Sequence, residues 1–199
     1  MRVLVIGASG LVGGAAADAL AEDGCEVLRA SRSAELSVDI TDPGSIQALY
    51  EQVGTLDAVV CAVGSVPFKP LGELSRDDFM AAYVGKVQAQ LDVVQLGTPH
   101  LGDGGSFTLT TGILAREPIA AGAAASLANG AVDSFVLAAA TELPRGLRIN
   151  AVSPTVLAEA TGYHSSFPGF AQVSAAAVGQ CFVKAVRGVQ TGRVFVLDA

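Results

Sequence analysis

The chain has 199 residues, of which 51% are hydrophobic, and it carries a formal net charge of −7. This length suits a single domain over residues 1–199, and it is short for two. The acidic balance, without a cluster of Lys and Arg, argues against a nucleic-acid partner. The longest stretch free of charge, residues 160–183, is interrupted by Gly, Pro, Ser, Gln and His, so no membrane span is predicted.

Strand-like apolar segments alternate with helical ones along the chain. This alternation predicts an α/β fold, a Rossmann-like doubly wound parallel sheet with helices on both faces. The expected strands are residues 2–6, 26–29, 58–61, 106–110, 147–151 and 194–197. The expected helices are residues 11–22, 43–52, 75–96, 126–143 and 174–187. Only about eight residues separate Arg29 from Val38, too few for a crossover helix, so we expect a vestigial third strand or a loop.

A glycine-punctuated turn follows the first expected strand. Gly7 permits a tight turn, Gly10 allows a pyrophosphate to approach the backbone, and Gly13 lets the next helix pack on the strand. The turn therefore predicts dinucleotide binding, although such turns also occur with no role beyond closing a loop. The intervening residues of this candidate site are Ala8, Ser9, Leu11 and Val12.

Cysteines and histidines are few and scattered. Cys25, Cys61 and Cys181 have no metal-ligand spacing, and His100 and His164 are the only histidines in the sequence. This pattern predicts no metal site and a reducing, cytoplasmic compartment, with no apparent partner for His100.

Five segments in order make the sequence resemble the short-chain dehydrogenase/reductase family over nearly its whole length. They are residues 7–13, 38–41, 61–64, 105–111 and 148–154. The resemblance implies the family's Rossmann fold and cofactor contacts that extend beyond the glycine turn. These implied contacts are Asp39, Ile40, Ala62, Val63, Gly64, Thr110, Pro154, Thr155 and Val156.

The choice of cofactor follows from charge. NAD-selective sites carry an acid near the end of the second strand, whereas NADP sites place an Arg there. Here Ser31, Arg32 and Ser33 stand at that point, and they can bind a 2′-phosphate. We therefore expect NADP(H), the alternative being that Arg32 is an ordinary solvated loop residue.

The family's proton-donating Tyr and its Lys are missing. Their positions fall at Ala125 and Asn129, and residues 119–141 contain no Tyr and no Lys. The only ionisable residue in that stretch is Asp133, which we expect on an outward or subunit-facing surface, as we do Glu142. Thr111 takes the place of the family's Ser.

Lys86 falls at or next to the family's Asn, and it could stabilise an oxyanion or supply the proton. Alternatively, Lys86 reaches the surface. Tyr163 and His164 lie in a short substrate loop, residues 159–173, where a role in covering the site is the alternative to substrate contact.

Two functions fit these features. One is an NADPH-dependent oxidoreductase acting on a carbonyl or activated double bond of a small molecule, with Thr111 and Lys86 as catalytic residues. The short loop suits a bulky or carrier-bound substrate. The other is a protein that binds NADP(H) without redox turnover, as a sensor or scaffold or in a non-redox reaction. The resemblance also implies a homodimer or tetramer built on the helices at 75–96 and 126–143.

Overall fold

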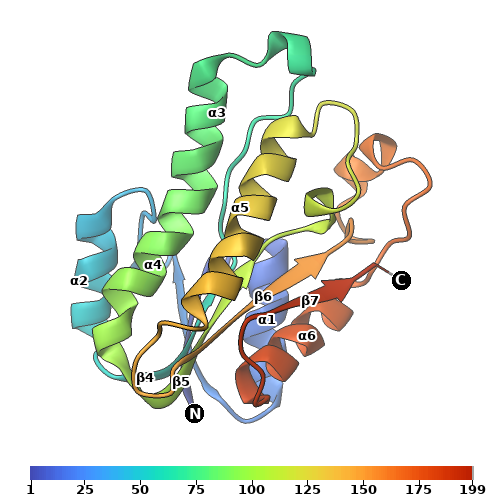
Figure 1. Ribbon diagram of the computed structural model, residues 1–199. Helices are drawn as coiled ribbons and strands as arrows, with labels where there is room; N and C mark the ends of the chain where they lie inside the picture. The colour runs from blue at the N-terminus through green and yellow to red at the C-terminus, as the bar shows by residue number, and fades with distance from the viewer. Residues whose placement is uncertain (199) are drawn as a thin grey trace.

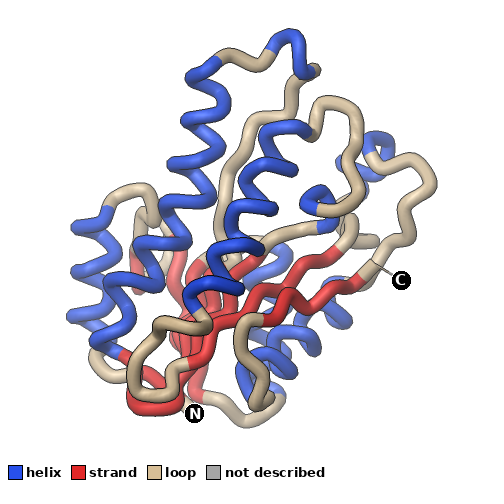
Figure 2. The backbone as a smooth tube through the Cα atoms, in the orientation of Figure 1, coloured by secondary structure: helices blue, strands red, loops and turns tan. Residues whose placement is uncertain are grey.

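The computed structural model describes residues 1–198, and over them it forms a seven-stranded parallel sheet with helices on both faces (Figures 1 and 2). The strand order is β3-β2-β1-β4-β5-β6-β7. The predicted doubly wound α/β fold is therefore confirmed. The strands are β1 (Arg2–Ile6), β2 (Glu26–Ser31), β3 (Leu36–Ser37), β4 (Leu56–Cys61), β5 (Leu101–Thr110), β6 (Arg148–Pro154) and β7 (Arg193–Leu197).

Helices cover the two faces of the sheet unequally. Helices α1 and α6 pack on one face, while α2, α4 and α5 build a larger apolar core on the other. The α-helices are α1 (Leu11–Glu22), α2 (Pro43–Val53), α3 (Arg76–Ala82), α4 (Ala89–Gly97), α5 (Ala123–Ala139) and α6 (Ala175–Arg187). Short 3-10 turns are η1 (Leu71–Glu73), η3 (Thr98–His100), η4 (Ile113–Ala115) and η5 (Thr161–Ser166), and η2 (Tyr83–Gln88) is a π-helix.

Polar side chains fix the starts of several helices. The Asp42 side chain accepts a hydrogen bond from the Gly44 amide at 2.9 Å, and Pro43 occupies the first position of α2. Ser75 and Asp78 form a reciprocal capping box at the start of α3. These local signals explain why the sequence alone placed these helix starts within a residue of those observed.

The short third strand is confirmed, because β3 has only two residues and pairs with the end of β2. Some predicted boundaries were wrong. Helix α5 begins at Ala123 rather than at Ser126, since its first residues are helix-favouring alanines. It also ends before residue 143, where Pro144 would break a continuing helix.

The helix expected over residues 75–96 is one rod made of α3, η2 and α4. Its middle segment has π geometry, which occurs in short pieces and often at functional sites. Within residues 1–198, no helix combines the length and apolar character needed to cross a membrane.

Candidate functional site

A cleft opens at the carboxyl ends of β1 and β4, where the strand order reverses direction. Ligands of doubly wound folds bind at this switch point. The cavity there has a volume of about 370 Å³. Its lining includes Gly7, Ser9, Gly10, Ser31, Arg32, Asp39, Ile40, Ala62, Val63, Gly64 and Gly85. The fold thus brings together most of the residues that the sequence predicted for cofactor contact.

The glycine turn leaves room that side chains would fill. Gly7 has φ +91°, a left-handed conformation, and an added Cβ would lie 2.7 Å from the Ala62 carbonyl oxygen. A Cβ on Gly13 would overlap the Gly7 carbonyl group. Helix α1 then begins at Leu11, after Gly10 in the N-cap position and without a side-chain cap from any described residue, so its first amides are free for an anion. This cradle fits a pyrophosphate.

The end of β2 offers polar groups to the same cavity. Ser31 is only 6% exposed, and in the described chain its Oγ has no hydrogen-bond partner. Arg32 is exposed beside it and lines the cavity with Asp39. The Asp39 carboxylate accepts bonds from the Thr41 amide and hydroxyl, at 2.9 and 2.7 Å, and the hydroxyl chiefly lowers the pKa of Asp39. Asp39 therefore organises its own turn, and Ser31 keeps a free hydroxyl.

A buried glutamine fixes the end of β5, where Thr111 follows. The Gln90 side chain, fully buried on α4, donates to the Thr110 carbonyl at 3.0 Å and accepts from the Thr110 amide at 3.1 Å. The Thr110 hydroxyl donates to the Cys61 carbonyl at 2.9 Å. Sequence reasoning missed Gln90, and its only signal was a polar residue on the apolar face of a helix.

Thr111 itself is held through its backbone. Its amide donates to the Val152 carbonyl at 3.0 Å, and the residue is 5% exposed. Its Oγ1 has no hydrogen-bond partner among residues 1–198. A buried hydroxyl without a partner carries a free-energy cost, so it is a natural place for a ligand atom.

Lys86 lies in the π segment η2 and points inward rather than out to solvent. Its Cγ and Cδ pack so closely on Gly64 that a Cβ there would lie 2.8 and 2.9 Å from them. Burial lowers the pKa of Lys86 from 10.5 to about 8, against the influence of Cys61 and Asp133. Burial also raises the pKa of Cys61 to about 12, so that side chain is a neutral thiol at ordinary pH.

Helix α5 packs short side chains against the segment that follows β5. Ala125 and Asn129 are 2% and 5% exposed, and Gly112 packs against the Asn129 amide group. The Asn129 Oδ1 finds no partner in the described part of the chain. Helix α5 therefore has a small apolar residue and a neutral amide where the family resemblance would put Tyr and Lys.

Asp133 is half-buried on α5, and its Oδ1 is buried. Burial raises the pKa of its carboxyl, while the Thr111 hydroxyl, Arg116 and Lys86 lower it. The outward or subunit-facing position expected for Asp133 stays a prediction. The expectation that His100 has no partner was wrong, since its ring stacks on Tyr50 with centroids 5.2 Å apart.

The ends of β6 and the following loop lie beyond the main cavity. Pro154, Thr155 and Val156 are buried, and the Thr155 hydroxyl donates to the Ala171 carbonyl at 3.1 Å. The His164 ring bonds the Leu157 carbonyl at 3.0 Å, while Tyr163 is 57% exposed. His164 thus helps to hold the loop closed at its base.

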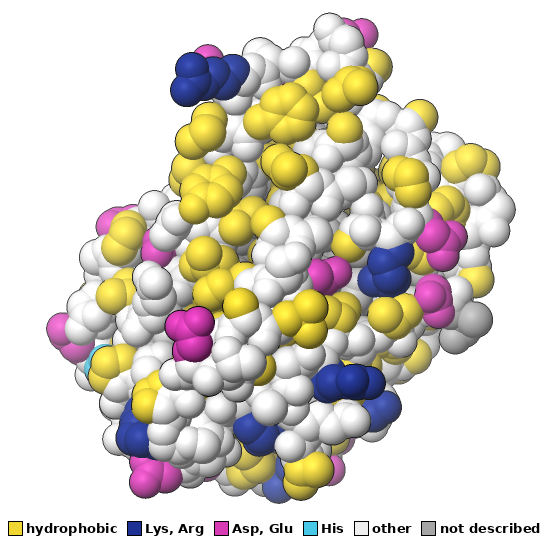
Figure 3. All heavy atoms as spheres, in the orientation of Figure 1, with side chains coloured by type: hydrophobic (Ala, Val, Ile, Leu, Met, Phe, Trp, Pro, Cys, Tyr) yellow, Lys and Arg dark blue, Asp and Glu magenta, His cyan; other side chains and the backbone are white. Residues whose placement is uncertain are grey.

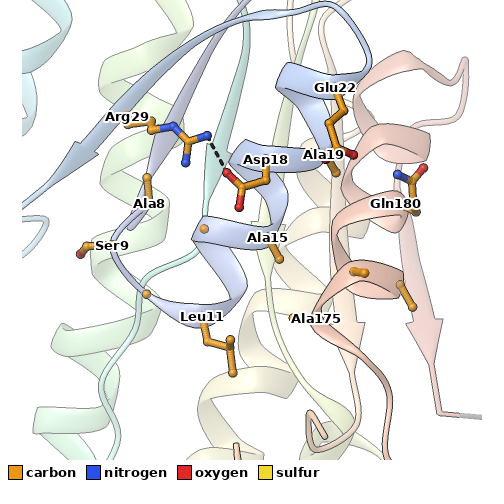
Figure 4. Close-up of a pocket in the computed structure, with 14 residues that line it drawn as sticks. Ala8, Ser9, Leu11, Ala15, Asp18, Ala19, Glu22, Arg29, Ala175 and Gln180 are labelled. Carbon is orange, nitrogen blue, oxygen red and sulfur yellow. Dashed lines mark hydrogen bonds and ion pairs between the residues drawn. The ribbon is translucent and has the colours of Figure 1, made fainter. Parts of the chain in front are cut away.

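A second hollow of about 920 Å³ lies between α1 and α6 (Figure 4). Ala8 and Leu11 of the glycine turn line this hollow and not the main cavity. Its charged groups include Arg29 and Asp18, which pair at 2.7 Å. Its remaining walls are mostly alanine and glycine, so we place the site in the smaller cavity at the switch point, where unpartnered polar groups converge.

The fold and the glycine turn define a doubly wound α/β protein with a cleft of the dinucleotide-binding kind. The family model described as enoyl-(acyl carrier protein) reductase matches residues 7–191. The chain therefore belongs to the short-chain dehydrogenase/reductase family, and this family supports an NAD(P)-dependent oxidoreductase.

Solved structures and sequence relatives agree with this assignment. The protein lin1944 from Listeria innocua is 47% identical, with a TM-score of 0.96 and 98% of each chain covered. A small-chain dehydrogenase in complex with NADPH has the same fold, with 23% identity, a TM-score of 0.89, and coverage of 100% of this chain and 96% of that one.

An uncharacterized oxidoreductase from Methylorubrum extorquens is 27% identical over 175 residues, covering 76% of this chain and 71% of the relative. Similarity extends to hydroxynaphthalene reductase arp2 from Aspergillus fumigatus, at 29% identity over 60% of this chain. The match covers only 45% of that longer relative.

Proposed function

We propose that this protein is an NADP(H)-dependent oxidoreductase that passes a hydride between nicotinamide and a carbonyl or activated double bond of a small molecule. One observation carries this proposal. The cavity lining runs from Ser31 and Arg32, past the glycine turn, to Gly64 and Gly85, which neighbour Lys86. One dinucleotide could lie along this path. Its adenosine 2′-phosphate would lie by Ser31 and Arg32, its pyrophosphate by the glycine turn, and its nicotinamide toward Gly64 and Gly85.

The preference for NADP(H) is supported by the groups at the end of β2. Arg32 supplies a guanidinium that can pair with a 2′-phosphate, and Ser31 holds a buried, unused hydroxyl at the same wall. The described NADPH complex of a small-chain dehydrogenase with the same fold is consistent with this choice.

Thr111 and Lys86 are the proposed catalytic residues. The free Thr111 hydroxyl would donate to the substrate oxygen. Lys86, whose pKa lies near 8, carries a proton it can release close to neutral pH. When bound, the nicotinamide cofactor would supply or accept the hydride.

A second candidate function is NADP(H) binding without redox turnover, as a sensor or scaffold or in a non-redox reaction. The sequence of α5, which contains neither Tyr nor Lys, favours it. The two candidates differ in whether hydrogen leaves the nicotinamide.

A measurement of isotope transfer distinguishes the oxidoreductase from the protein that binds NADP(H) without redox turnover. NADPH labelled with deuterium at C4, on each face in turn, would be mixed with the protein, a panel of carbonyls and enones, and cell extract. We expect deuterium in one product from one labelled face only. Tight NADPH binding with no transfer from either face would contradict the oxidoreductase proposal and support the binding protein.

We further propose a homodimer or tetramer in the cytoplasm, acting on a bulky or carrier-bound substrate beneath the short loop. Exposed apolar side chains gather over α3 and the neighbouring part of α5 (Figure 3). Met80, Leu127 and Leu137 are 49%, 54% and 57% exposed, and such patches favour association. A monomer in light scattering would contradict the assembly.

A further inference from the structure

Arg116 places a guanidinium at the end of η4, the short turn that follows Thr111. Its Nη1 atom donates to the hydroxyl of the fully buried Ser153 at 2.8 Å, and among residues 1–198 its side chain makes no other hydrogen bond. The ion pairs within those same residues use other cations, namely Arg2, Arg29, Lys69, Arg145 and Arg187. Arg116 therefore keeps its positive charge and most of its N–H donors for a group outside the fold.

The bond to Ser153 holds this guanidinium close to the Thr111 hydroxyl. The Thr111 amide donates to the Val152 carbonyl at 3.0 Å, which continues the β5–β6 ladder and sets Thr111 beside Ser153. Leu109 and Ala151 both belong to the core that includes α5, and Thr111 and Ser153 come two residues later, so they point to that same face. Adjacent strands are about 4.8 Å apart. A small molecule that touches the Thr111 hydroxyl can therefore also reach the guanidinium.

A small apolar cluster fixes the segment from which Arg116 projects. Ile113 and Leu114 of η4 are buried, and Phe167 and Phe170 of the short substrate loop pack against them. The two phenyl rings meet edge to face, with centroids 5.4 Å apart. The Arg116 amide donates to the Ile113 carbonyl at 2.8 Å. The base of Arg116 is thus ordered before a ligand arrives, which reduces the entropy lost on binding.

The charge of this site is opposite to that of the whole protein. The chain carries a net charge of −7, so its long-range field repels anions. A fixed guanidinium without an acidic neighbour within 4.0 Å supplies a local exception among the described residues. The planar fork of an arginine matches the two oxygens of a carboxylate with parallel hydrogen bonds. The group that best fits Arg116 is therefore a carboxylate.

We propose that Arg116 determines the substrate class: its guanidinium binds a carboxylate of the substrate, while the Thr111 hydroxyl holds the carbonyl oxygen beside it. The substrate is then a keto acid whose carboxylate lies close to the reacting carbonyl, with an apolar remainder against Phe167 and Phe170. This inference rests on the proposed function, because it names the substrate of that reaction. Ser153 positions the guanidinium and does not touch the substrate.

Keto acids and their methyl esters test the role of the charge, since each pair differs in the carboxylate alone. Phenylglyoxylate, further keto acids and the matching esters would be offered with deuterium-labelled NADPH. Wild type should prefer an accepted acid to its ester by about tenfold or more in kcat/KM. Arg116→Gln should lower kcat/KM for the acid about tenfold to a hundredfold and leave the ester within about twofold. Arg116→Lys keeps the charge without the fork and should lie between them.

The matched control is Arg193→Gln, which removes the same charge at the start of β7, away from the carboxyl ends of the strands. This control should leave the preference for the acid unchanged. Ser153→Ala keeps the charge of Arg116 and removes its anchor, so it should reduce the preference only in part. A purely structural Arg116 would lower turnover of acid and ester alike, and that result would overturn the proposal.

Binding without turnover distinguishes failure of this proposal from failure of the proposed function. The probes are para-fluorobenzoate and para-fluorophenylacetate, each with its amide, titrated by ¹⁹F NMR with and without NADP⁺. Wild type should bind a carboxylate more tightly than its amide, and Arg116→Gln should lose that difference.

If wild type shows this difference but transfers no deuteride, the proposed function fails and the carboxylate site stands. If wild type binds no carboxylate better than its amide, or if Arg116→Gln keeps the difference, the carboxylate site is refuted whether or not deuteride is transferred.

Discussion

The two ends of the cleft are built in different ways. At the cofactor end, Gly7 to Gly13 come from one continuous segment, and the important groups are backbone amides and missing side chains. At the proposed reaction end, Thr111 follows β5 and Lys86 lies in η2, two separate segments, and the important groups are side chains. The glycine turn is formed by one short segment, so substitutions elsewhere in the chain should leave it unchanged. The geometry of the reaction end depends instead on how several helices and strands pack together.

The comparison also bears on what the protein can do. The cofactor end fits the family resemblance, whereas α5 contains no Tyr and no Lys and has Ala125 and Asn129 at the positions where the resemblance would put them. The lysine proposed for the reaction end lies in η2, and the buried Gln90 on the next helix fixes the end of β5, just before Thr111. A change at one end should therefore leave the other intact, and the following variants examine that independence.

The largest effect is expected at the reaction end. Thr111→Ala and Lys86→Met should each lower turnover by about a hundredfold to ten-thousandfold, the range for loss of acid–base or oxyanion groups. NADPH affinity should stay within about twofold, because binding energy is concentrated on the phosphates. Steady-state kinetics and fluorescence titration measure both quantities. Lys184→Met, on the exposed side of α6, is the control, and unaltered turnover in both test variants would refute the assignment.

At the cofactor end, Gly13→Ala should destabilise the fold and weaken NADPH binding. The new Cβ would overlap the Gly7 carbonyl group, and such overpacking costs about 1–3 kcal/mol of unfolding free energy. Gly14→Ala is the matched control, since its Cβ meets only the Ala8 carbonyl oxygen at 3.4 Å and alanine favours a helix. Urea denaturation compares them, and equal stability of the two variants would contradict the close packing described for Gly13.

Arg32→Ala should weaken NADPH binding about tenfold to a hundredfold, the value of a charge-assisted bond to phosphate, and leave NADH binding unchanged. Isothermal titration with both cofactors measures this difference. Arg29→Ala is the control, because Arg29 lies on β2, three residues before Arg32, but pairs with Asp18 outside the cavity. Equal losses for NADPH and NADH would mean that Arg32 does not contact a 2′-phosphate.

The smallest effect concerns stability and pH. The pKa of Lys86 is lowered on folding from 10.5 to about 8, so the unfolded chain binds more protons between these values. The free energy of unfolding should therefore rise with pH over that window, and the buried amine should be costly below it. Lys86→Met should raise Tm by about 3 °C or more at pH 7.

This difference between wild type and Lys86→Met should close as the pH approaches 10.5. Differential scanning calorimetry across pH 6–10 measures the gap. A constant gap would show that Lys86 titrates as an exposed lysine does, and would remove it from the buried cluster.

The sequence by itself determined the order of elements, the short third strand and the glycine turn. Each of these follows from interactions between residues close in the chain: apolar runs, the Asp42–Pro43 helix start, and glycines that relieve local crowding. Most of the predicted cofactor residues meet in one cavity because the doubly wound topology brings consecutive loops to the same edge of the sheet.

Only the tertiary structure decided the composition of the reaction end. Whether Lys86 points inward depends on its packing against Gly64, and the burial of Asn129 depends on how α5 packs against Gly112. Gln90 gave only a weak local signal, a polar residue on the apolar face of a helix. Side-chain direction and burial come from contacts between segments distant in the sequence, and one sequence without its fold does not specify those contacts.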